Sequence, residues 1–266
     1  MEGHGAMSRT TVNESTCIKD YSCVAVCPTG TLGIDERGFP KEVSEATCIS
    51  CGHCMAVCST GAIEIDGLPV EEFESLPAAM AGQKELEALM KSRRSIRVFR
   101  DKPVSAETIE ALLEIARRAP SAKNSQLLHW IVVNGKEKVR ALARETIEGL
   151  LPASARPALV EMWESGADRL LRGAPAVVLA CAPAKFSWGA DDAVIALSYL
   201  ELAAAARGLG VCWAGYLKLV AASHQPVQDM LNVPEGYVVR GALMLGESKF
   251  RYRRIPPRKP ASVSWI

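Results

Sequence analysis

The 266-residue sequence lacks long hydrophobic runs, and only 6% of its residues are aromatic. No apolar stretch approaches the roughly 20 residues that a membrane-spanning helix needs, so we expect no membrane partner. The first residues, MEGHGAMSRTTVNES, contain neither an apolar core nor a cleavage pattern. This segment therefore does not read as a secretory signal peptide, and we expect a cytoplasmic location.

The sequence also lacks a net excess of either charge, because its formal net charge is only +1. The charges are nevertheless unevenly distributed. Residues 1–75 contain 4 Lys or Arg and 12 Asp or Glu, whereas residues 76–266 contain 27 and 18. Such asymmetry indicates two modules. The basic part can attract an anionic cofactor, but no nucleic-acid recognition motif accompanies it, so we expect no nucleic-acid partner.

Cysteine is scarce beyond residue 58. Seven of the nine cysteines lie between positions 17 and 58, and the other two, Cys181 and Cys212, have apolar neighbours. We interpret Cys181 and Cys212 as buried, unreactive thiols. A dense cysteine cluster in a chain without a signal peptide indicates metal binding rather than disulfides.

The cysteine-rich segment is a repeat with a spacing of 31 residues. CIKDYSCVAVCPTGTLGID at 17–35 aligns with CISCGHCMAVCSTGAIEID at 48–66, and Asp20 stands opposite Cys51. The ends of the two copies, TLGID and AIEID, each predict a short strand after a Thr-Gly turn. A duplication of this kind indicates two copies of one small unit.

The second copy has the pattern C-x2-C-x2-C-x3-C, and residues 10–67 resemble the bacterial two-cluster ferredoxin module. In that module three closely spaced cysteines bind one cluster and the fourth binds the other. The resemblance implies a 4Fe-4S cluster at Cys48, Cys51, Cys54 and Cys27. It implies a second cluster at Cys17, Asp20, Cys23 and Cys58. Zinc, which usually takes two separated pairs of ligands, fits seven cysteines in a repeat less well.

Asp20 leaves the iron content of the second cluster open. A carboxylate is a harder ligand than a thiolate and holds iron less firmly in such a site. One alternative is a 4Fe-4S cluster with an Asp-ligated iron, and the other is a 3Fe-4S cluster beside a solvated Asp20.

Residues 68–82 contain two prolines and an acidic run, and they read as a linker with a single helical turn. Beyond the linker, caps and hydrophobic periodicity predict several helices and strands. The predicted helices start at Gln83 and after the N-cap Ser105, and span 136–151, 156–173, 191–207 and about 223–231. The predicted strands span 129–135, 174–183 and 237–248. The basic, Pro-rich tail is expected to extend along a surface.

Three segments, at 93–104, 116–135 and 196–217, resemble the FMN-dependent nitroreductases, and this resemblance covers residues 83–266. The whole chain thus resembles a ferredoxin–nitroreductase fusion, with domains at 1–67 and 83–266. The resemblance implies an α+β fold in which a small ferredoxin-like two-cluster module precedes a central, mainly antiparallel sheet wrapped by helices. It also implies a homodimer with FMN at the interface.

The FMN phosphate is a dianion, which favours paired guanidinium donors. The resemblance implies that Arg93, Ser95 and Arg97 hold the phosphate and ribityl chain, with Arg94 beside them. It implies that a loop of the neighbouring subunit lies against the ring, and that Gly215 lies near the ring atom N5. The implied FMN-binding residues are Arg93, Arg94, Ser95, Arg97, Pro120, Ser121, Asn124, Gly215 and Arg258, with Arg254 as the alternative to Arg258 in the tail. No acid–base catalytic residue is predicted.

The combined resemblance implies an FMN-dependent oxidoreductase, a nitroreductase-like flavin-dependent reductase. It would pass electrons from built-in iron–sulfur clusters to flavin and on to an electron-poor acceptor, such as a nitroaromatic, a quinone or another flavin. Ferredoxin or NAD(P)H is the expected external donor. The alternative is a non-catalytic electron-transfer module or a sensor of redox state or iron.

Overall fold

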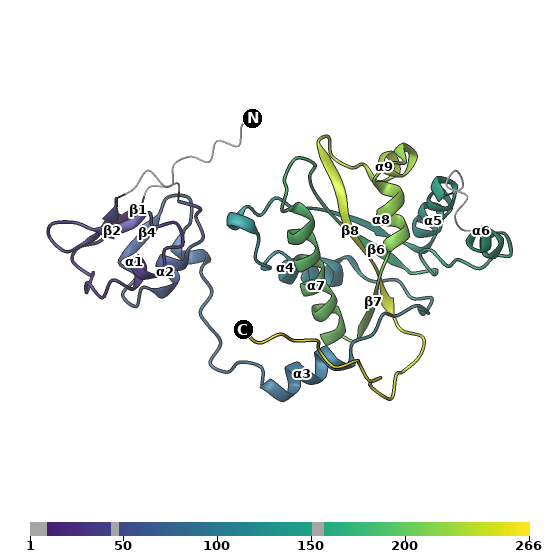
Figure 1. Cartoon of the computed structure of the whole chain (residues 1–266), viewed down its shortest axis with the longest axis horizontal. Coiled ribbons are helices and arrows are strands. Elements are labelled where there is room, and N and C mark those ends of the chain that lie inside the picture. Colours follow the sequence, from purple (N-terminus) through teal and green to yellow (C-terminus); the bar gives the residue numbers. More distant parts are fainter. Residues whose placement is uncertain (1–9, 44–47, 151–156) are drawn as a thin grey trace. The chain divides into compact units, whose positions relative to one another are not determined.

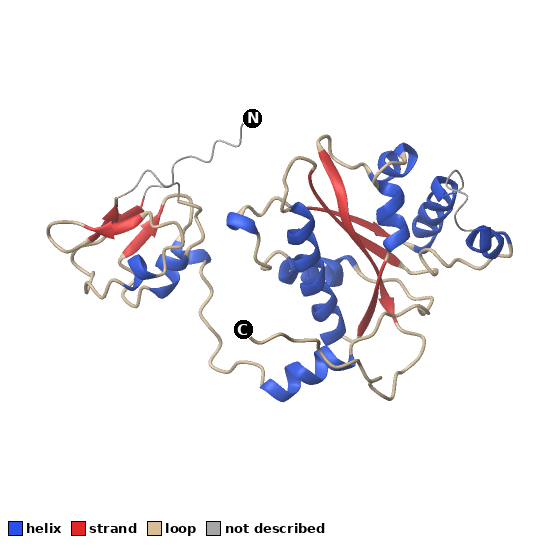
Figure 2. Ribbon diagram, in the orientation of Figure 1, coloured by secondary structure: helices blue, strands red, loops and turns tan. Residues whose placement is uncertain are grey.

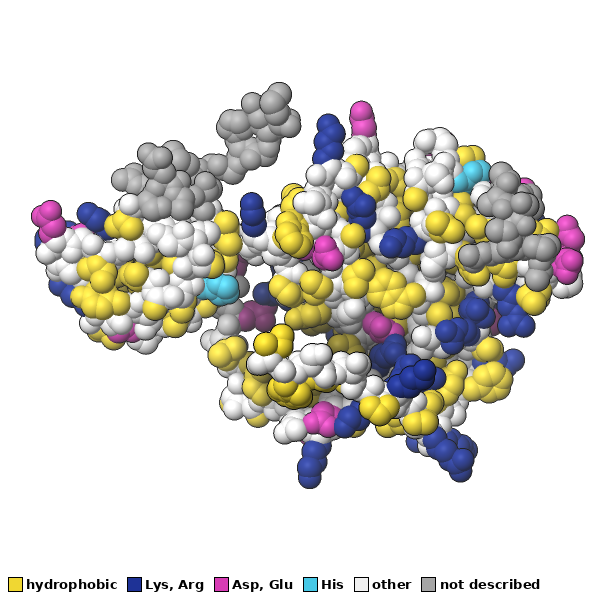
Figure 3. Space-filling model, in the orientation of Figure 1, with side chains coloured by type: hydrophobic (Ala, Val, Ile, Leu, Met, Phe, Trp, Pro, Cys, Tyr) yellow, Lys and Arg dark blue, Asp and Glu magenta, His cyan; other side chains and the backbone are white. Residues whose placement is uncertain are grey.

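The computed structural model describes residues 10–43, 48–150 and 157–266, which divide into two compact units (Figure 1). The first unit comprises the described residues up to Met80, and the second comprises the bulk of those from Ala81 onward. On the face drawn in Figure 3, Lys and Arg side chains are more numerous over the second unit, in agreement with the uneven charge of the sequence.

The first unit contains two short antiparallel strand pairs and two short helices. Strand β1 pairs with β4, and β2 pairs with β3, so each pair joins a strand that precedes one copy of the repeat to a strand within the other copy. The strands predicted from TLGID and AIEID are β2 and β4. The elements are β1 (Thr10–Val12), α1 (Ser22–Ala25), β2 (Leu32–Ile34), β3 (Pro40–Glu42), α2 (His53–Val57) and β4 (Ile63–Ile65).

The two copies of the repeat share one backbone conformation. Gly30 and Gly61, 31 residues apart, have φ angles of 65° and 63°. This left-handed region is easily reached only by glycine. In each copy the glycine N–H donates to a cysteine carbonyl oxygen at 3.3 Å, that of Cys27 or Cys58. The structure therefore bears out the duplication inferred from the sequence.

The core of the first unit is small and partly made of cysteine. Its buried residues are Cys23, Leu32, Cys54, Met55, Ile63 and Ile65. A core of this size contributes little to the stability of a small domain. The chain then continues through the short 3-10 helix η1 (Val70–Glu72), the single helical turn expected in the linker.

The second unit is built on one antiparallel sheet with the strand order β5-β6-β8-β7. Helices α4 and α7 cover one face, and α5 and α8 cover the other (Figures 1 and 2). The elements that form the sheet and its covering layers are α3 (Gln83–Ser92), α4 (Ala106–Ala116), β5 (His129–Asn134), α5 (Lys136–Leu150), α6 (Pro157–Glu164), β6 (Ala176–Pro183), α7 (Gly189–Ala206), β7 (Leu209–Trp213), α8 (Gly215–Ala221), α9 (Gln225–Leu231) and β8 (Tyr237–Glu247).

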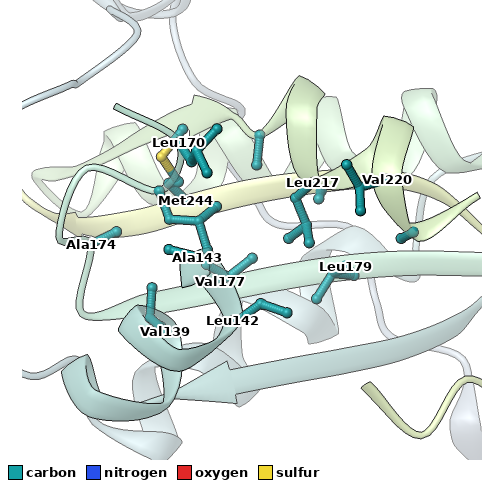
Figure 4. Packing of buried hydrophobic residues seen from close by; sticks show 14 of the residues in the cluster. Val139, Leu142, Ala143, Leu170, Ala174, Val177, Leu179, Leu217, Val220 and Met244 are labelled. Atoms are coloured by element: carbon teal, nitrogen blue, oxygen red, sulfur yellow. The ribbon is translucent and has the colours of Figure 1, made fainter. Parts of the chain in front are cut away.

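The central strand β6 is buried on both faces. Its residues Val177 and Leu179 pack with Val139 and Leu142 of α5 (Figure 4). The intervening residue Val178 packs on the opposite face, against α7. This alternation follows from the two-residue period of a strand, and it explains why the β6 sequence is apolar throughout.

Two predictions for the second unit were wrong in part. The helix expected at 156–173 ends at Glu164, and the Asp168 carboxylate then accepts N–H hydrogen bonds from Leu170, Leu171 and Gly173. The segment after α7 was assigned no strand. It forms β7, which pairs with β8, and then helix α8.

Other predictions were confirmed. Ser105 is the N-cap of α4, and its Oγ accepts the Thr108 N–H at 3.2 Å. Residues 251–266 form no helix or strand and are exposed, as expected for an extended tail. Among the described helices, none combines the length and the apolar character needed to cross a bilayer.

Candidate cofactor sites

Four cysteines line a single pocket of the first unit. Cys27 comes from the first copy of the repeat, and Cys48, Cys51 and Cys54 come from the second. This is the crossed set that the ferredoxin resemblance implies for one cluster. Burial raises the pKa of the Cys54 thiol to about 11, and neighbouring Cys48 and Cys51 contribute to the rise. Because iron binds thiolates, cluster binding at this pocket must release protons.

The remaining three cysteines also lie together. Burial raises the pKa of the Cys23 thiol, and the proximity of Cys58 and Cys17 raises it further. Cys58 belongs to the second copy, so this group also combines cysteines of both copies, as the ferredoxin resemblance implies. Within the described residues, no three His, Cys, Asp or Glu are close enough together to hold a single metal ion.

A threonine lies beside the last cysteine of each repeat copy. Neither threonine was assigned to a cluster site from the sequence. The Cys27 Sγ lies 3.6 Å from Thr29 Oγ1, and the Cys58 Sγ lies 3.6 Å from Thr60 Oγ1. The Ala62 N–H also donates to Cys58 Sγ at 3.2 Å. Hydrogen bonds to ligand sulfurs tune the reduction potential of a cluster. The repeated Thr-Gly pair was the sequence signal that could have identified these residues.

Asp20 differs in its surroundings from its counterpart Cys51. Its side chain is exposed, and Oδ1 accepts the Ser22 N–H at 3.2 Å. Cys51 is partly buried in the four-cysteine pocket. The backbone hydrogen bond holds Asp20 at the start of α1 in the position that the repeat gives to a cysteine.

In the second unit, the arginine-rich segment after α3 lies beside β7. Ser95 forms a parallel bridge to Val211, and the Ile96 N–H donates to the Val211 carbonyl oxygen at 2.9 Å. The Arg93 Nη1 atom donates to Oε1 of the buried Glu201 at 2.5 Å. Arg93 and Arg94 line one pocket with Glu201, so this pocket contains both signs of charge.

A larger pocket of about 660 Å³ lies against β8 and α8. It brings together two residues that the sequence assigned to FMN, Arg97 and Gly215, which are far apart in the chain. No Asp or Glu is among its described lining residues. Four basic residues missed in the sequence join Arg97 there, namely Arg169, Arg172, Lys218 and Arg240.

The basic side chains of this pocket influence one another. Burial lowers the pKa of Arg172, and the nearby Arg97 and Arg169 lower it further, against an opposite contribution from Cys212. Arg172 also has a φ of 60°, a conformation that few non-glycine residues adopt. Like charges gathered in a cavity with a perturbed pKa mark a candidate site for an anion.

The other predicted FMN residues lie elsewhere in the chain. Pro120, Ser121 and Asn124 belong to the loop after α4, where Ser121 Oγ accepts the Gln126 N–H at 3.0 Å. Arg258 lies in the exposed tail. None of these four is among the residues that line the larger pocket of the same chain. Their predicted contact with FMN therefore stays a prediction.

Comparison with known proteins identifies both modules. The nitroreductase family model matches residues 90–247, which is more than half of the chain, so the chain belongs to the nitroreductase family. A 4Fe-4S dicluster domain model matches residues 9–59. The predicted ferredoxin–nitroreductase fusion and its fold class are thus confirmed.

A protein of Archaeoglobus fulgidus with the provisional name NADH dehydrogenase/NAD(P)H nitroreductase is 30% identical over 59% of this chain and 82% of its own length. A nitroreductase of Bacteroides fragilis, solved with bound FMN, is 25% identical, with a TM-score of 0.61 over 68% of this chain and 98% of that one. A nitroreductase of Desulfitobacterium hafniense, also with bound FMN, is 27% identical, with a TM-score of 0.59 over 70% and 100%.

Proposed function

We propose that this protein is an FMN-dependent oxidoreductase that passes electrons from its own iron–sulfur clusters, by way of flavin, to an electron-poor acceptor. The observation that carries the proposal is the larger pocket. Arg97 and Gly215, which the nitroreductase resemblance assigns to FMN, line it together with four further cations. A basic pocket without a carboxylate suits an anionic cofactor.

The residues present fit both the phosphate end and the ring end of FMN. Arg93, Arg94 and Ser95 would supply donors for the phosphate, and Glu201 pairs with the Arg93 guanidinium. In the larger pocket, Arg97 would hold the phosphate and ribityl chain and Gly215 would lie near the ring, and Trp213 and Tyr216 also line this pocket. Bound there, FMN supplies the chemistry that converts single electrons into a hydride equivalent. The cations that line this pocket would stabilise a cofactor that gains negative charge.

The cysteines of the first unit fit two clusters. We propose Cys27, Cys48, Cys51 and Cys54 as ligands of a 4Fe-4S cluster, because they line one pocket. We propose Cys17, Cys23 and Cys58, together with Asp20, as ligands of the second cluster. Such clusters supply one-electron transfer, and their potential depends on the hydrogen bonds to sulfur.

We also propose a homodimer that takes electrons from ferredoxin or NAD(P)H. On α7, Val194, Ile195 and Tyr199 are exposed apolar side chains in a helix that is apolar on nearly every side. Burial of such a surface favours association. The name of the Archaeoglobus relative refers to NADH and NAD(P)H, which supports a pyridine nucleotide as one donor.

The test uses the full chain purified without oxygen. Iron and FMN are counted, the protein is reduced with dithionite, and a nitroaromatic or quinone is added. We expect bound FMN, bleaching of the flavin band on reduction, and sustained turnover of the acceptor. Arg97→Gln should weaken FMN binding, whereas Arg100→Gln, outside the pocket, should not. A chain that retains clusters but never binds FMN would refute the proposal. A single re-oxidation without turnover would favour the electron-transfer or sensor alternative.

A further inference from the structure

A β-bulge in β8 lies at the wall of the larger pocket. Along most of the β6–β8 pair the residues match one to one, but Ala180 pairs with Gly241 and the next residue, Cys181, pairs with Val239. Arg240 is therefore the extra residue, without a partner in β6. Bulges of this kind redirect a side chain and occur often beside active sites.

The bulge places two consecutive residues in one pocket. Val239 and Arg240 both line it, although neighbours in a regular strand face opposite sides. The following residue, Gly241, faces the other layer, because a Cβ there would lie 2.4 Å from Leu197 of α7. The irregular register thus turns the Arg240 guanidinium toward the pocket without moving the rest of β8.

The Arg240 guanidinium is held in position but is not neutralised. Its Nη2 atom donates to the Ala184 carbonyl oxygen at 3.1 Å. Its Nε atom is buried and has no hydrogen-bond partner among the described residues. No carboxylate of the described chain pairs with it. Because the Nε atom has almost no exposed surface, a ligand would reach this guanidinium through its Nη atoms, and no carboxylate of the described chain competes for them.

The basic residues of this pocket come from separate positions along the backbone. Arg97 and Arg172 lie near Cys212, which pairs with Met244 of β8. Arg240 precedes Met244 by four residues, which is about 13 Å along a strand. Gly215, Trp213 and Tyr216 also line this pocket. Arg240 therefore joins the chain at a different strand position from the residues near Cys212, and the Ala184 carbonyl oxygen fixes its guanidinium there.

We propose that Arg240 is a specificity-determining residue that binds the carboxylate of an aromatic electron acceptor. The inference rests on the proposed function, because it places the acceptor in the pocket that contains Gly215. A guanidinium binds a carboxylate through two parallel hydrogen bonds, which orients as well as attracts it. The aromatic side chains of Trp213 and Tyr216 suit the ring of such an acceptor. Arg240 takes no part in electron transfer itself.

The test compares two acceptors of similar size, 4-nitrobenzoate and the neutral 4-nitrobenzyl alcohol, with full-length holoenzyme. Loss of a hydrogen-bonded ion pair changes affinity by about 10- to 100-fold. Arg240→Gln should raise KM for 4-nitrobenzoate by this factor and leave kcat nearly unchanged. KM for the alcohol should change by less than about 3-fold. Arg240→Lys, which keeps the charge but not the forked geometry, should give an intermediate KM.

A second readout needs no turnover. Benzoate is titrated into the oxidised holoenzyme by calorimetry, and Arg240→Gln should weaken its binding by the same factor. Arg100→Gln is the matched control, because Arg100 also donates to one backbone carbonyl, that of Ser248, and is not a lining residue of this pocket. Lys218→Gln changes an exposed cation of the same pocket and should have a smaller effect.

If Arg240→Gln changed KM equally for both acceptors, or left the affinity for benzoate unchanged, the inference would be overturned. Loss of FMN from Arg240→Gln would also overturn it, because Arg240 would then hold the cofactor. These outcomes differ from failure of the proposed function, in which the wild-type chain itself would lack FMN or turnover.

Discussion

The two units of this protein are held together by different means. In the first, the buried cluster contains six residues, and two of them, Cys23 and Cys54, are proposed iron ligands. In the second, apolar clusters cover both faces of a four-stranded sheet. The first unit also leaves large apolar side chains such as Ile18 and Ile34 exposed, at 62% and 47%. We therefore expect folding of the first unit to depend on bound clusters, and folding of the second to depend on packing.

Removal of iron should have the largest effect and should separate the two units. An iron chelator added without oxygen should unfold the first unit, because its small core cannot offset the entropy of the ordered chain. In hydrogen-exchange mass spectrometry, peptides from β1, β2 and β4 should lose protection completely. Peptides from β6 and α7 should keep theirs. Protected strands in an iron-free first unit would show that its apolar core suffices.

A substitution that creates a cavity in the second unit should destabilise that unit and leave the clusters of the first unit unchanged. Leu200 of α7 is fully buried, and Leu200→Ala should lower the free energy of unfolding of this unit by about 2–5 kcal/mol. Denaturant titration followed by circular dichroism measures this change. The paramagnetic resonance signals of the clusters should stay the same. Leu219→Ala, at a position 56% exposed, is the control and should cost less than about 0.5 kcal/mol.

The smallest expected effect lies within the first unit, between the two copies of the repeat. Because the backbones match, Asp20→Cys should give the first copy a fourth thiolate and slow its loss of iron in air. Cys51→Asp should make the other cluster labile in the same way. Iron counts and paramagnetic resonance spectra during air exposure measure both. If the wild-type cluster at Asp20 already keeps its iron as well as the Asp20→Cys variant, the carboxylate is an adequate ligand.

The sequence predicted those parts of the structure that depend on local pattern. The 31-residue repeat, the Ser105 cap and the apolar β6 are all encoded by neighbouring residues. Strand β7 was missed because five residues after a glycine turn become a strand only by pairing with β8. Glu201, which pairs with Arg93 from 108 positions away, was missed for a similar reason.

The arginines of the larger pocket also show that local sequence pattern predicts only part of the site. Arg97 could be assigned from its motif, because its neighbours in the chain resemble a known segment. Arg240 could not, because its orientation results from the register between β6 and β8 rather than from the residues beside it. Candidate site residues could be proposed from the sequence where a motif contains them, and they were missed where only the fold brings them together.

The central claim is that electrons pass between the clusters and FMN within this chain. The most direct measurement mixes fully reduced protein with a nitroaromatic acceptor, without oxygen, and follows the flavin absorption band and the cluster resonance signals together. Both should return to the oxidised state in the holoenzyme, and the clusters should stay reduced in protein stripped of FMN. Re-oxidation of the flavin alone, with the clusters still reduced, would contradict the account.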